Sequence, residues 1–359
     1  MAVPLGNHHL RREDAGETLV EVLVRRAREA SGAWQEANDL VRANRVQVDG
    51  NICTDPARLM RAGEVVKVLP HGRAPQARAV DVRIVFADEH LVVIDKPPAV
   101  TTLREPSGPG QTSRRGQSPK GGRGQATLEE MVGAVLLERK GGASGRAVRP
   151  RGKPATLRTG HPPRSKVYPV HRLDRDTSGL MLFARTPAAE QALTGQFKAR
   201  EVHRSYLAVV HDHPGAMTIT SHIVRDRGDG LRGSAQAWGL DPAGGQRAVT
   251  HVEPLERIGG YTLVRCTLET GRTHQIRIHL SEAGHMLCGE KEYTRRPPAA
   301  GGGRMRDDSR APRQALHADR LSFAHPMTGR EMRFTQKLPP DLLRWLEELR
   351  ARDPRSGHR

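Results

Sequence analysis

The sequence is poor in aromatic residues and cysteine, and it contains no long apolar run. Aromatic side chains make up only 3% of its 359 residues, so stacking on a ligand must depend on a few of them. Cys53, Cys266 and Cys288 lie far apart, which argues against a disulfide framework or a cysteine zinc site and fits a reducing compartment. No apolar stretch reaches the ~20 residues of a membrane span, and residues 1–10 lack the apolar core of a secretory signal. We therefore expect a cytoplasmic protein with no membrane association.

Positive charge is in excess. The chain has 58 Lys and Arg against 40 Asp and Glu, a formal net charge of +18 and a pI near 10.8. Such an excess indicates a polyanionic partner, with nucleic acid as the first candidate and an anionic membrane surface as the second. Residues 104–166 alone hold 14 Lys or Arg against 4 acids. This segment is therefore expected to contribute strongly to binding a polyanion.

The densest group of charged and turn-forming residues is Val170–Leu180, which reads V-H-R-L-D-R-D-T-S-G-L. An apolar run before Asp174, turn formers at 176–179 and apolar residues at 180–183 predict a strand, a tight turn and a second strand. A turn of this kind presents its charges to a cleft or leaves them in solvent. Asp174 is the better candidate for chemistry because it follows an apolar residue, whereas Asp176 is expected to bond its own backbone in the turn.

A second dense stretch, residues 271–279, reads G-R-T-H-Q-I-R-I-H. We expect Thr273 to cap a helix that Gly284 ends, with Arg277 facing a cleft from its first turns. Between the two stretches, residues 186–198 begin with Thr-Pro and predict a helix. Alternation in the strand that follows, at 200–210, puts residues 204 and 206 on the same face.

The motifs H-R-L-D-x-x-T-S-G at 171–179 and G-R-T-H-Q-I-R-x-H at 271–279 resemble signatures of the RluA-type pseudouridine synthases, which isomerise uridine in ribosomal or transfer RNA. Two weaker elements are similar as well, at Lys96-Pro97 and at Gly289–Tyr293, where Glu290 stands for the family's Asp. The resemblance implies an α+β fold with a mixed, mostly antiparallel catalytic sheet. It also implies that no cofactor and no metal are needed.

This resemblance places a catalytic domain at 81–350, with basic loop insertions at 104–166 and 294–313. Apolar spacing inside the first insertion predicts a helix beginning at Thr127, between two arms rich in Gly, Pro and Ser that are expected to be disordered. The remaining segments are expected to be a linker at 71–80 and tails at 1–16 and 351–359.

Residues 17–70 predict a small αβ domain. Helical spacing occurs at 19–26 and 37–41, a D-G hairpin turn at 49–50, and a last strand at 63–68. The arrangement resembles the small RNA-binding domain named after ribosomal small-subunit protein four. An unrelated αβ module is the alternative.

The resemblance also implies roles for individual residues. Asp174 would act as nucleophile or base, Arg277 would be its ion-pair partner, and Tyr206 would stack on the base and help to remove the C5 proton. Arg172 would fill the space left by the flipped uridine. Further RNA contacts are expected from Lys96, Arg204, Arg272 and His274.

The expected protein is thus a monomeric RNA pseudouridine synthase, and the appended N-terminal domain favours large-subunit ribosomal RNA over transfer RNA. A transfer-RNA synthase and a non-catalytic RNA-binding protein are the alternatives, since charge alone would support the latter. A metal-dependent hydrolase is a weaker alternative, because its possible ligands do not have the short paired spacing of zinc sites. Those ligands would be Asp174 with His171, His203, His274 and His279.

Overall fold

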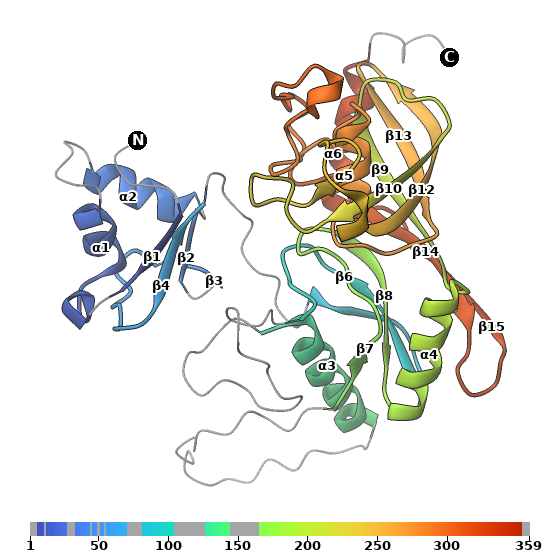
Figure 1. The fold of residues 1–359 in the computed structure, drawn as a ribbon. Coiled ribbons are helices and arrows are strands. Elements are labelled where there is room, and N and C mark those ends of the chain that lie inside the picture. Colours follow the sequence, from blue (N-terminus) through green and yellow to red (C-terminus); the bar gives the residue numbers. More distant parts are fainter. Residues whose placement is uncertain are drawn as a thin grey trace, which may run out of the picture. The chain divides into compact units, whose positions relative to one another are not determined.

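The structure is a computed structural model, and it describes residues 6–10, 12–26, 33–43, 45–48, 51–53, 55–69, 81–103, 126–143 and 165–353. The described chain forms two compact units, an N-terminal unit that contains residues 6–69 and a C-terminal unit that contains residues 81–103, 128–143 and 165–353 (Figure 1). Four expected features lie outside the described residues: the linker at 71–80, the arms at 104–125 and 144–164, the hairpin turn at 49–50 and the end of the tail at 354–359.

The N-terminal unit packs two helices against a four-stranded antiparallel sheet. The helices are α1 (Leu19–Arg26) and α2 (Ala33–Arg42). The strands, in their order across the sheet, are β1 (Gly6–His9), β4 (Val65–Val68), β2 (Val46–Val48) and β3 (Asn51–Ile52). Apolar residues of α1, α2, β2 and β4 form one buried core. The two helices and the final strand expected from the sequence are confirmed.

The expectation that residues 1–16 are only a tail is wrong for the described part of that segment. All four residues of β1 pair with β4, so β4 is not left with an open edge. A short 3-10 helix, Arg12–Asp14, follows and buries the Asp14 side chain. That carboxylate accepts hydrogen bonds from Arg25 and from Arg26, the latter at 2.9 Å. The sequence G-N-H-H has no apolar alternation, so no local pattern marks it as a strand.

The C-terminal unit is built on one eleven-stranded sheet, which the described residues define as β5 (Arg83–Ala87), β6 (Leu91–Lys96), β7 (Tyr168–Pro169), β8 (Ser178–Ala184), β9 (His203–His211), β10 (Met217–Val224), β11 (Gly233–Ser234), β12 (Gln246–Ile258), β13 (Tyr261–Leu268), β14 (Leu316–Ala324) and β15 (Glu331–Thr335). The strand order is β11-β10-β12-β13-β9-β14-β8-β6-β5, with β15 beside β14 and β7 beside β8. Among the strands that the structure describes in this sheet, only β14 and β8 pair in parallel. The expected mixed, mostly antiparallel sheet of an α+β fold is confirmed.

Helices cover this sheet in two places. In one, α4 (Pro187–Ala199) packs Ala189 and Leu193 onto apolar residues of β6 and β8. In the other, α6 (Pro340–Ala351) packs its apolar stripe, including Trp345, onto β9 and β13. The Thr186 side chain caps α4 and a proline follows it, as the sequence predicts. The remaining helices are α3 (Leu128–Ala143), expected inside the insertion, α5 (Gln275–Glu282), and 3-10 turns at Pro242–Gly244 and Pro298–Ala300.

Strand register brings the two dense motifs together. Ala318 of β14 pairs with Gly179 of β8 on one side and with Tyr206 of β9 on the other. Two strand spacings separate Gly179 from Tyr206, or about 10 Å. Gly179 has φ +115°, and a Cβ there would lie 2.3 Å from the Ala318 carbonyl oxygen, so only glycine fits. The turn before β8 is therefore fixed beside the middle of β9.

The chain before this turn differs from the expected hairpin. β7 has only two residues, and residues 170–177, which we call the Asp174 loop, lie outside the sheet. Several of their polar backbone groups bond side chains and not a neighbouring strand. Leu173 bonds Thr102 through both its N–H and its carbonyl. After the two residues of β7, the rest of the expected strand is thus a packed loop, and the sequence pattern alone cannot distinguish such a loop from a strand.

Candidate active site

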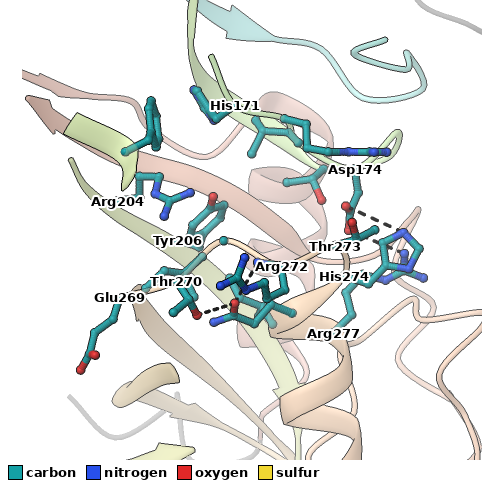
Figure 2. A pocket seen from close by; sticks show the side chains of 18 of the residues that line it. His171, Asp174, Arg204, Tyr206, Glu269, Thr270, Arg272, Thr273, His274 and Arg277 are labelled. Carbon is teal, nitrogen blue, oxygen red and sulfur yellow. Dashed lines mark hydrogen bonds and ion pairs between the residues drawn. The ribbon is translucent and has the colours of Figure 1, made fainter. Parts of the chain in front are cut away.

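A cavity of about 510 Å³ opens where the Asp174 loop, the end of α4, β9 and the segment 268–277 meet. Figure 2 shows Asp174, His274 and Arg277 on one side of it and Arg204 and Tyr206 on the other. Seven of the eight residues that the sequence singles out line this cavity: Arg172, Asp174, Arg204, Tyr206, Arg272, His274 and Arg277.

Asp174 begins a tight turn, in which the Thr177 N–H donates to the Asp174 carbonyl at 3.2 Å. Its carboxylate faces the cavity and is largely covered, with 16% of the side chain exposed. Asp176 lies in the same turn but does not line the cavity, and its carboxylate accepts a hydrogen bond from Arg175 at 2.7 Å. The two carboxylates therefore differ in surroundings, and of the two only Asp174 faces the cavity.

Side chains from distant parts of the sequence hold the Asp174 loop in place through hydrogen bonds. The Lys96 ammonium donates to three backbone carbonyl oxygens at 2.8–3.1 Å, two of which belong to this loop. Thr102 Oγ1 donates to the Leu173 carbonyl at 3.0 Å, and Gln314 Nε2 donates to Thr177 Oγ1 at 2.7 Å. Such bonds fix the direction in which the Asp174 carboxylate points.

Lys96 corrects one sequence expectation. Its side chain is fully buried behind the Asp174 loop and does not line the cavity, so the predicted RNA contact is wrong. Burial lowers the pKa of its ammonium to about 7, although the charges of Asp176 and Asp174 oppose that shift. A lysine after a strand is usually solvated, and only the fold shows that three carbonyl oxygens enclose this one.

We expect Lys96→Met to reduce turnover on the order of 10²-fold, because the loop that carries Asp174 loses its support. The salt dependence of RNA affinity should not change, since a buried ammonium neutralises no phosphate. Lys198→Met is the matched control: this exposed lysine lines the cavity, and its loss should lower the salt slope of RNA affinity with turnover retained. A lower salt slope in Lys96→Met would show that this lysine does reach RNA.

Arg277 enters the cavity from the first turn of α5, and its main partners were not expected. Its Nε and Nη2 atoms donate to the two carboxylate oxygens of Glu290 at 2.8 and 2.6 Å, and Nη2 also donates to Glu292 at 2.9 Å. Only Nη1 faces Asp174, at 3.7 Å. The predicted pairing of Arg277 with Asp174 therefore exists as the looser contact, and Glu290 is the primary partner.

Electrostatics follow from this arrangement. Burial alone would lower the pKa of Arg277, but the Glu290 charge and its hydrogen bonds, followed by Asp174 and Glu292, raise it well above the ordinary value. Burial alone would raise the pKa of Glu290, but Arg277 and backbone N–H groups lower it to about 2. Both groups are thus charged at neutral pH, and a fixed cation stands beside Asp174.

The start of α5 also differs from expectation. Thr273 does not cap the helix; His274 is the N-cap, in the left-handed conformation (φ +59°) and without a side-chain capping bond. A non-glycine residue there is strained by ~1–3 kcal/mol, which is typical of sites where a side chain must be aimed. The predicted end of the helix is confirmed, because Gly284 has φ +90° and the His285 N–H donates to the Leu280 carbonyl.

Gln275 holds the segment before α5 in place, a role that the sequence reading missed. Its Oε1 accepts from Thr270 Oγ1 at 2.8 Å and from the Arg272 N–H at 3.0 Å. Its Nε2 donates to the Val249 carbonyl at 2.9 Å. The buried amide therefore holds the segment before α5 against β12. The sequence signal available for this role was the position of Gln275 between Arg272 and Arg277.

Tyr206 and Arg204 point from one face of β9 into the cavity, as their alternation predicts. Burial and the Asp174 charge raise the pKa of Tyr206, with Arg204 opposing, so its hydroxyl is protonated at neutral pH. The Arg204 guanidinium lies 5.2 Å from the ring centroid of Phe197, and His171 stacks on the same ring at 4.9 Å. This wall of the cavity offers flat and cationic surfaces to a ligand.

Arg172 and Arg272 stand at the edge of the cavity. Arg172 is exposed, and Arg272 is partly buried and donates from Nε to the Arg247 carbonyl at 3.1 Å.

The histidines considered as metal ligands do not converge: His171 accepts from the Leu182 N–H, and His279 is buried between Ser221 and Thr250. Among the described residues no group of three or more His, Cys, Asp or Glu side chains is placed to hold a metal ion. Nor does that part of the chain contain a helix long and apolar enough to cross a membrane.

The sequence model of the RNA pseudouridylate synthase family matches residues 90–282, a span that includes both dense motifs and most of the cavity. The chain belongs to this family. It is an RNA pseudouridine synthase, an isomerase whose substrate is RNA, as the motifs predict.

Relatives match this synthase over most of its length. It is 32% identical to the ribosomal large subunit pseudouridine synthase D of Xanthomonas campestris, with 97% of this chain and 91% of that protein covered. The protein of the same name from Pseudomonas aeruginosa is 33% identical, with 87% and 86% covered. Among solved structures, human RNA pseudouridylate synthase domain containing 4 matches with a TM-score of 0.52 at 21% identity, covering 75% of this chain and 93% of that one. The last likeness shows the shared fold.

Proposed function

We propose that this synthase isomerises uridine in large-subunit ribosomal RNA, acting as a monomer in the cytoplasm, with Asp174 as the nucleophile or base. The observation that carries the proposed mechanism is the meeting of Asp174, Arg277 and Tyr206 in one cavity. The names of the full-length relatives in Xanthomonas and Pseudomonas and the formal charge of +18 support ribosomal RNA as the target. Transfer RNA is the alternative substrate.

The reaction breaks the bond between ribose C1′ and base N1 and joins C1′ to C5. The base gains a proton at N1 and loses one from C5, so atoms and electrons balance within the substrate and no redox cofactor or metal is required. The Asp174 carboxylate either attacks the ribose or removes a proton from it, with the Arg277 cation facing it. Tyr206 stacks on the base while it turns, and its protonated hydroxyl favours hydrogen bonding over removal of the C5 proton.

A uridine inside a helix must leave its stack to reach this cavity, because Asp174 is largely covered. Arg172 is the residue placed to fill the vacated space, since it is exposed at the cavity edge and only two residues from Asp174. The cavity lining also offers cationic or hydrogen-bonding groups to the bound nucleotide, from Arg204, Arg272 and His274.

The direct test is conversion of uridine to pseudouridine in ribosomal and transfer RNA from cells that lack this gene. Purified protein is added, the RNA is digested, and the products are quantified and mapped by mass spectrometry. Pseudouridine that appears only in transfer RNA would move the proposal to the alternative substrate. Tight binding without conversion of any RNA would contradict the catalytic assignment.

We further propose that the N-terminal unit selects the RNA, because no residue that lines the cavity belongs to it. A chain that begins near Val80 should keep conversion of a short stem-loop that carries the mapped uridine, since the catalytic cavity is intact. It should lose on the order of tenfold or more in preference for full-length ribosomal RNA over that stem-loop, since it lacks the N-terminal contacts. Competition between the two RNAs measures this preference. Equal preference in the full and shortened chains would argue against a selecting role.

A further inference from the structure

His274 lies between the proposed catalytic carboxylate and a buried tyrosine. Its Nε2 atom is 3.9 Å from Asp174 Oδ1, and its Nδ1 atom is 2.7 Å from the Tyr293 hydroxyl oxygen. Arg277 Nη1 approaches the other oxygen of Asp174, Oδ2, at 3.7 Å. Figure 2 shows the His274 ring beside the Asp174 carboxylate, with Arg277 below it. Each carboxylate oxygen therefore has one nitrogen facing it.

The Tyr293 hydroxyl determines which nitrogen of His274 carries the proton. The Tyr293 side chain is buried, with 1% of the residue exposed. Among the described residues, Nδ1 of His274 is the only hydrogen-bond partner of the Tyr293 hydroxyl. Burial raises the pKa of Tyr293, so the hydroxyl keeps its proton at neutral pH. A buried donor without an acceptor is costly, so the hydroxyl donates to Nδ1. Nδ1 then has no proton, and the neutral ring carries it on Nε2.

The charges around His274 favour the same tautomer. A lone pair on Nε2 would face the Asp174 carboxylate and be repelled, whereas an N–H there is attracted. Burial lowers the pKa of His274, which disfavours the imidazolium. Among its neighbours, Asp174 opposes that shift, Arg277 adds to it, and the carboxylates of Glu292 and Glu290 oppose it more weakly. A neutral ring protonated on Nε2 satisfies both the tyrosine and the carboxylate.

We propose that Tyr293 is a positioning residue that fixes the tautomer of His274, so that His274 presents Nε2–H to Asp174 Oδ1 while Arg277 presents Nη1–H to Oδ2. The carboxylate is thereby held in one orientation by a donor on each oxygen. At 3.9 and 3.7 Å the contacts of His274 and Arg277 with Asp174 are both longer than hydrogen bonds, and catalytic contacts of this kind tighten in the complex with substrate. The inference rests on the proposed role of Asp174, but the tautomer can be measured without any substrate.

The first measurement is the protonation of the His274 ring in the full-length protein labelled with ¹⁵N-histidine. Long-range ¹H–¹⁵N correlation spectra distinguish the two neutral tautomers and the imidazolium, and the spectrum of His274→Gln identifies the signals of His274. We expect protonated Nε2 and bare Nδ1 in the unmutated protein. Tyr293→Phe should show a mixture of tautomers or the imidazolium. A proton on Nδ1 in the unmutated protein overturns the inference.

The second measurement is turnover of RNA by Tyr293→Phe, with Tyr261→Phe as the matched control. The Tyr261 hydroxyl also donates to a partner, Asp308, at 2.8 Å, but Asp308 does not line the cavity, whereas His274, the partner of Tyr293, does. Tyr293→Phe should lower kcat by roughly 10- to 100-fold with KM unchanged, whereas the control keeps its kcat. An unchanged kcat in Tyr293→Phe would contradict the inference.

A third variant separates the tautomer from packing. The amide nitrogen of a glutamine reaches about where Nε2 of histidine lies and always carries protons, so His274→Gln needs no tyrosine to set its tautomer. We therefore expect Tyr293→Phe to cost at least tenfold in the unmutated protein and less than threefold in the His274→Gln background. Equal costs in both backgrounds would make Tyr293 a packing residue and overturn the inference. If the unmutated protein shows the expected tautomer but converts no uridine, the proposed function fails while the tautomer assignment stands.

Discussion

Asp174→Asn should lower conversion of uridine by roughly 10⁴-fold or more while RNA affinity holds or improves. Losses of this size follow removal of a nucleophile or base from a catalytic group that acts as a unit. Asparagine has nearly the same shape, but its amide neither attacks carbon nor takes up a proton at neutral pH. Removing a negative charge from a cationic cavity does not weaken binding of a polyanion. The loss should therefore appear in kcat and not in Kd.

Asp176→Asn is the matched control for this variant. It removes the same charge two residues away in the same turn, but its side chain does not line the cavity and its partner is Arg175. Asparagine serves turns as well as aspartate does, so this variant should fold and react at close to the normal rate. Both variants are compared for conversion with a chelator present, which excludes a contribution from adventitious metal. Full conversion by Asp174→Asn would refute the proposed mechanism, and equal losses in the two variants would point to the fold of the turn.

Much of this site could be predicted from sequence because its residues lie in two compact motifs. Residues 171–179 contribute five residues to the cavity lining, among them Arg172 and Asp174. Residues 271–279 contribute seven, among them Arg272, His274 and Arg277. Strand alternation placed Arg204 and Tyr206 on one face, and the family resemblance implied the role of Tyr206. What joins the three segments is the register at Ala318, which pairs with Gly179 and Tyr206. That register depends on long-range pairing and could not be read locally.

The residues that support the site were harder to predict because their roles depend on burial. Lys96 at a strand end resembles any solvated lysine, and only the path of the Asp174 loop encloses it. Glu290 and Tyr293 were noted as parts of a weak motif, but nothing in their spacing revealed that they hold Arg277 and His274. The edge strand Gly6–His9 was missed for a related reason, since its stability comes from β4 and not from its own composition. Tertiary contacts override local pattern at each of these positions.

The Glu290 carboxylate is surrounded by hydrogen-bond donors. Its Oε1 atom accepts from Arg277 Nη2 at 2.6 Å and also from the backbone N–H groups of Glu292 and Tyr293, at 2.9 and 3.3 Å. Its Oε2 atom accepts from Arg277 Nε at 2.8 Å. Every partner is a donor, and the carboxylate is buried. An acceptor-only group with a negative charge is therefore required at this position.

Glu290→Gln should destabilise the C-terminal unit by about 3–5 kcal/mol at pH 7, because it breaks one half of a buried pair. In either orientation, the glutamine NH₂ group would face donors: the Arg277 guanidinium on one side, or the backbone N–H groups on the other. Glu290→Asp, which restores the residue type of the family motif, keeps the charge and should lose much less. The free energy of unfolding in urea, followed by the fluorescence of Trp238 and Trp345 in the C-terminal unit, measures both variants. A loss for Glu290→Gln no larger than for Glu290→Asp would show that the charge is dispensable.

The cost of Glu290→Gln should also depend on pH in a defined direction. The pKa of Glu290 is about 2 in the folded protein against an ordinary value of 4.5, so on acidification the unfolded state takes up the proton first. The charged pair therefore stabilises the fold fully above about pH 4.5, by about 3 kcal/mol, and this contribution disappears as the pH falls towards 2. The difference in unfolding free energy between the unmutated protein and Glu290→Gln should thus shrink steadily between pH 5 and pH 3, whereas glutamine itself does not titrate. A difference that stays constant over this range would mean that Glu290 is not held as the buried anion on which the position of Arg277 depends.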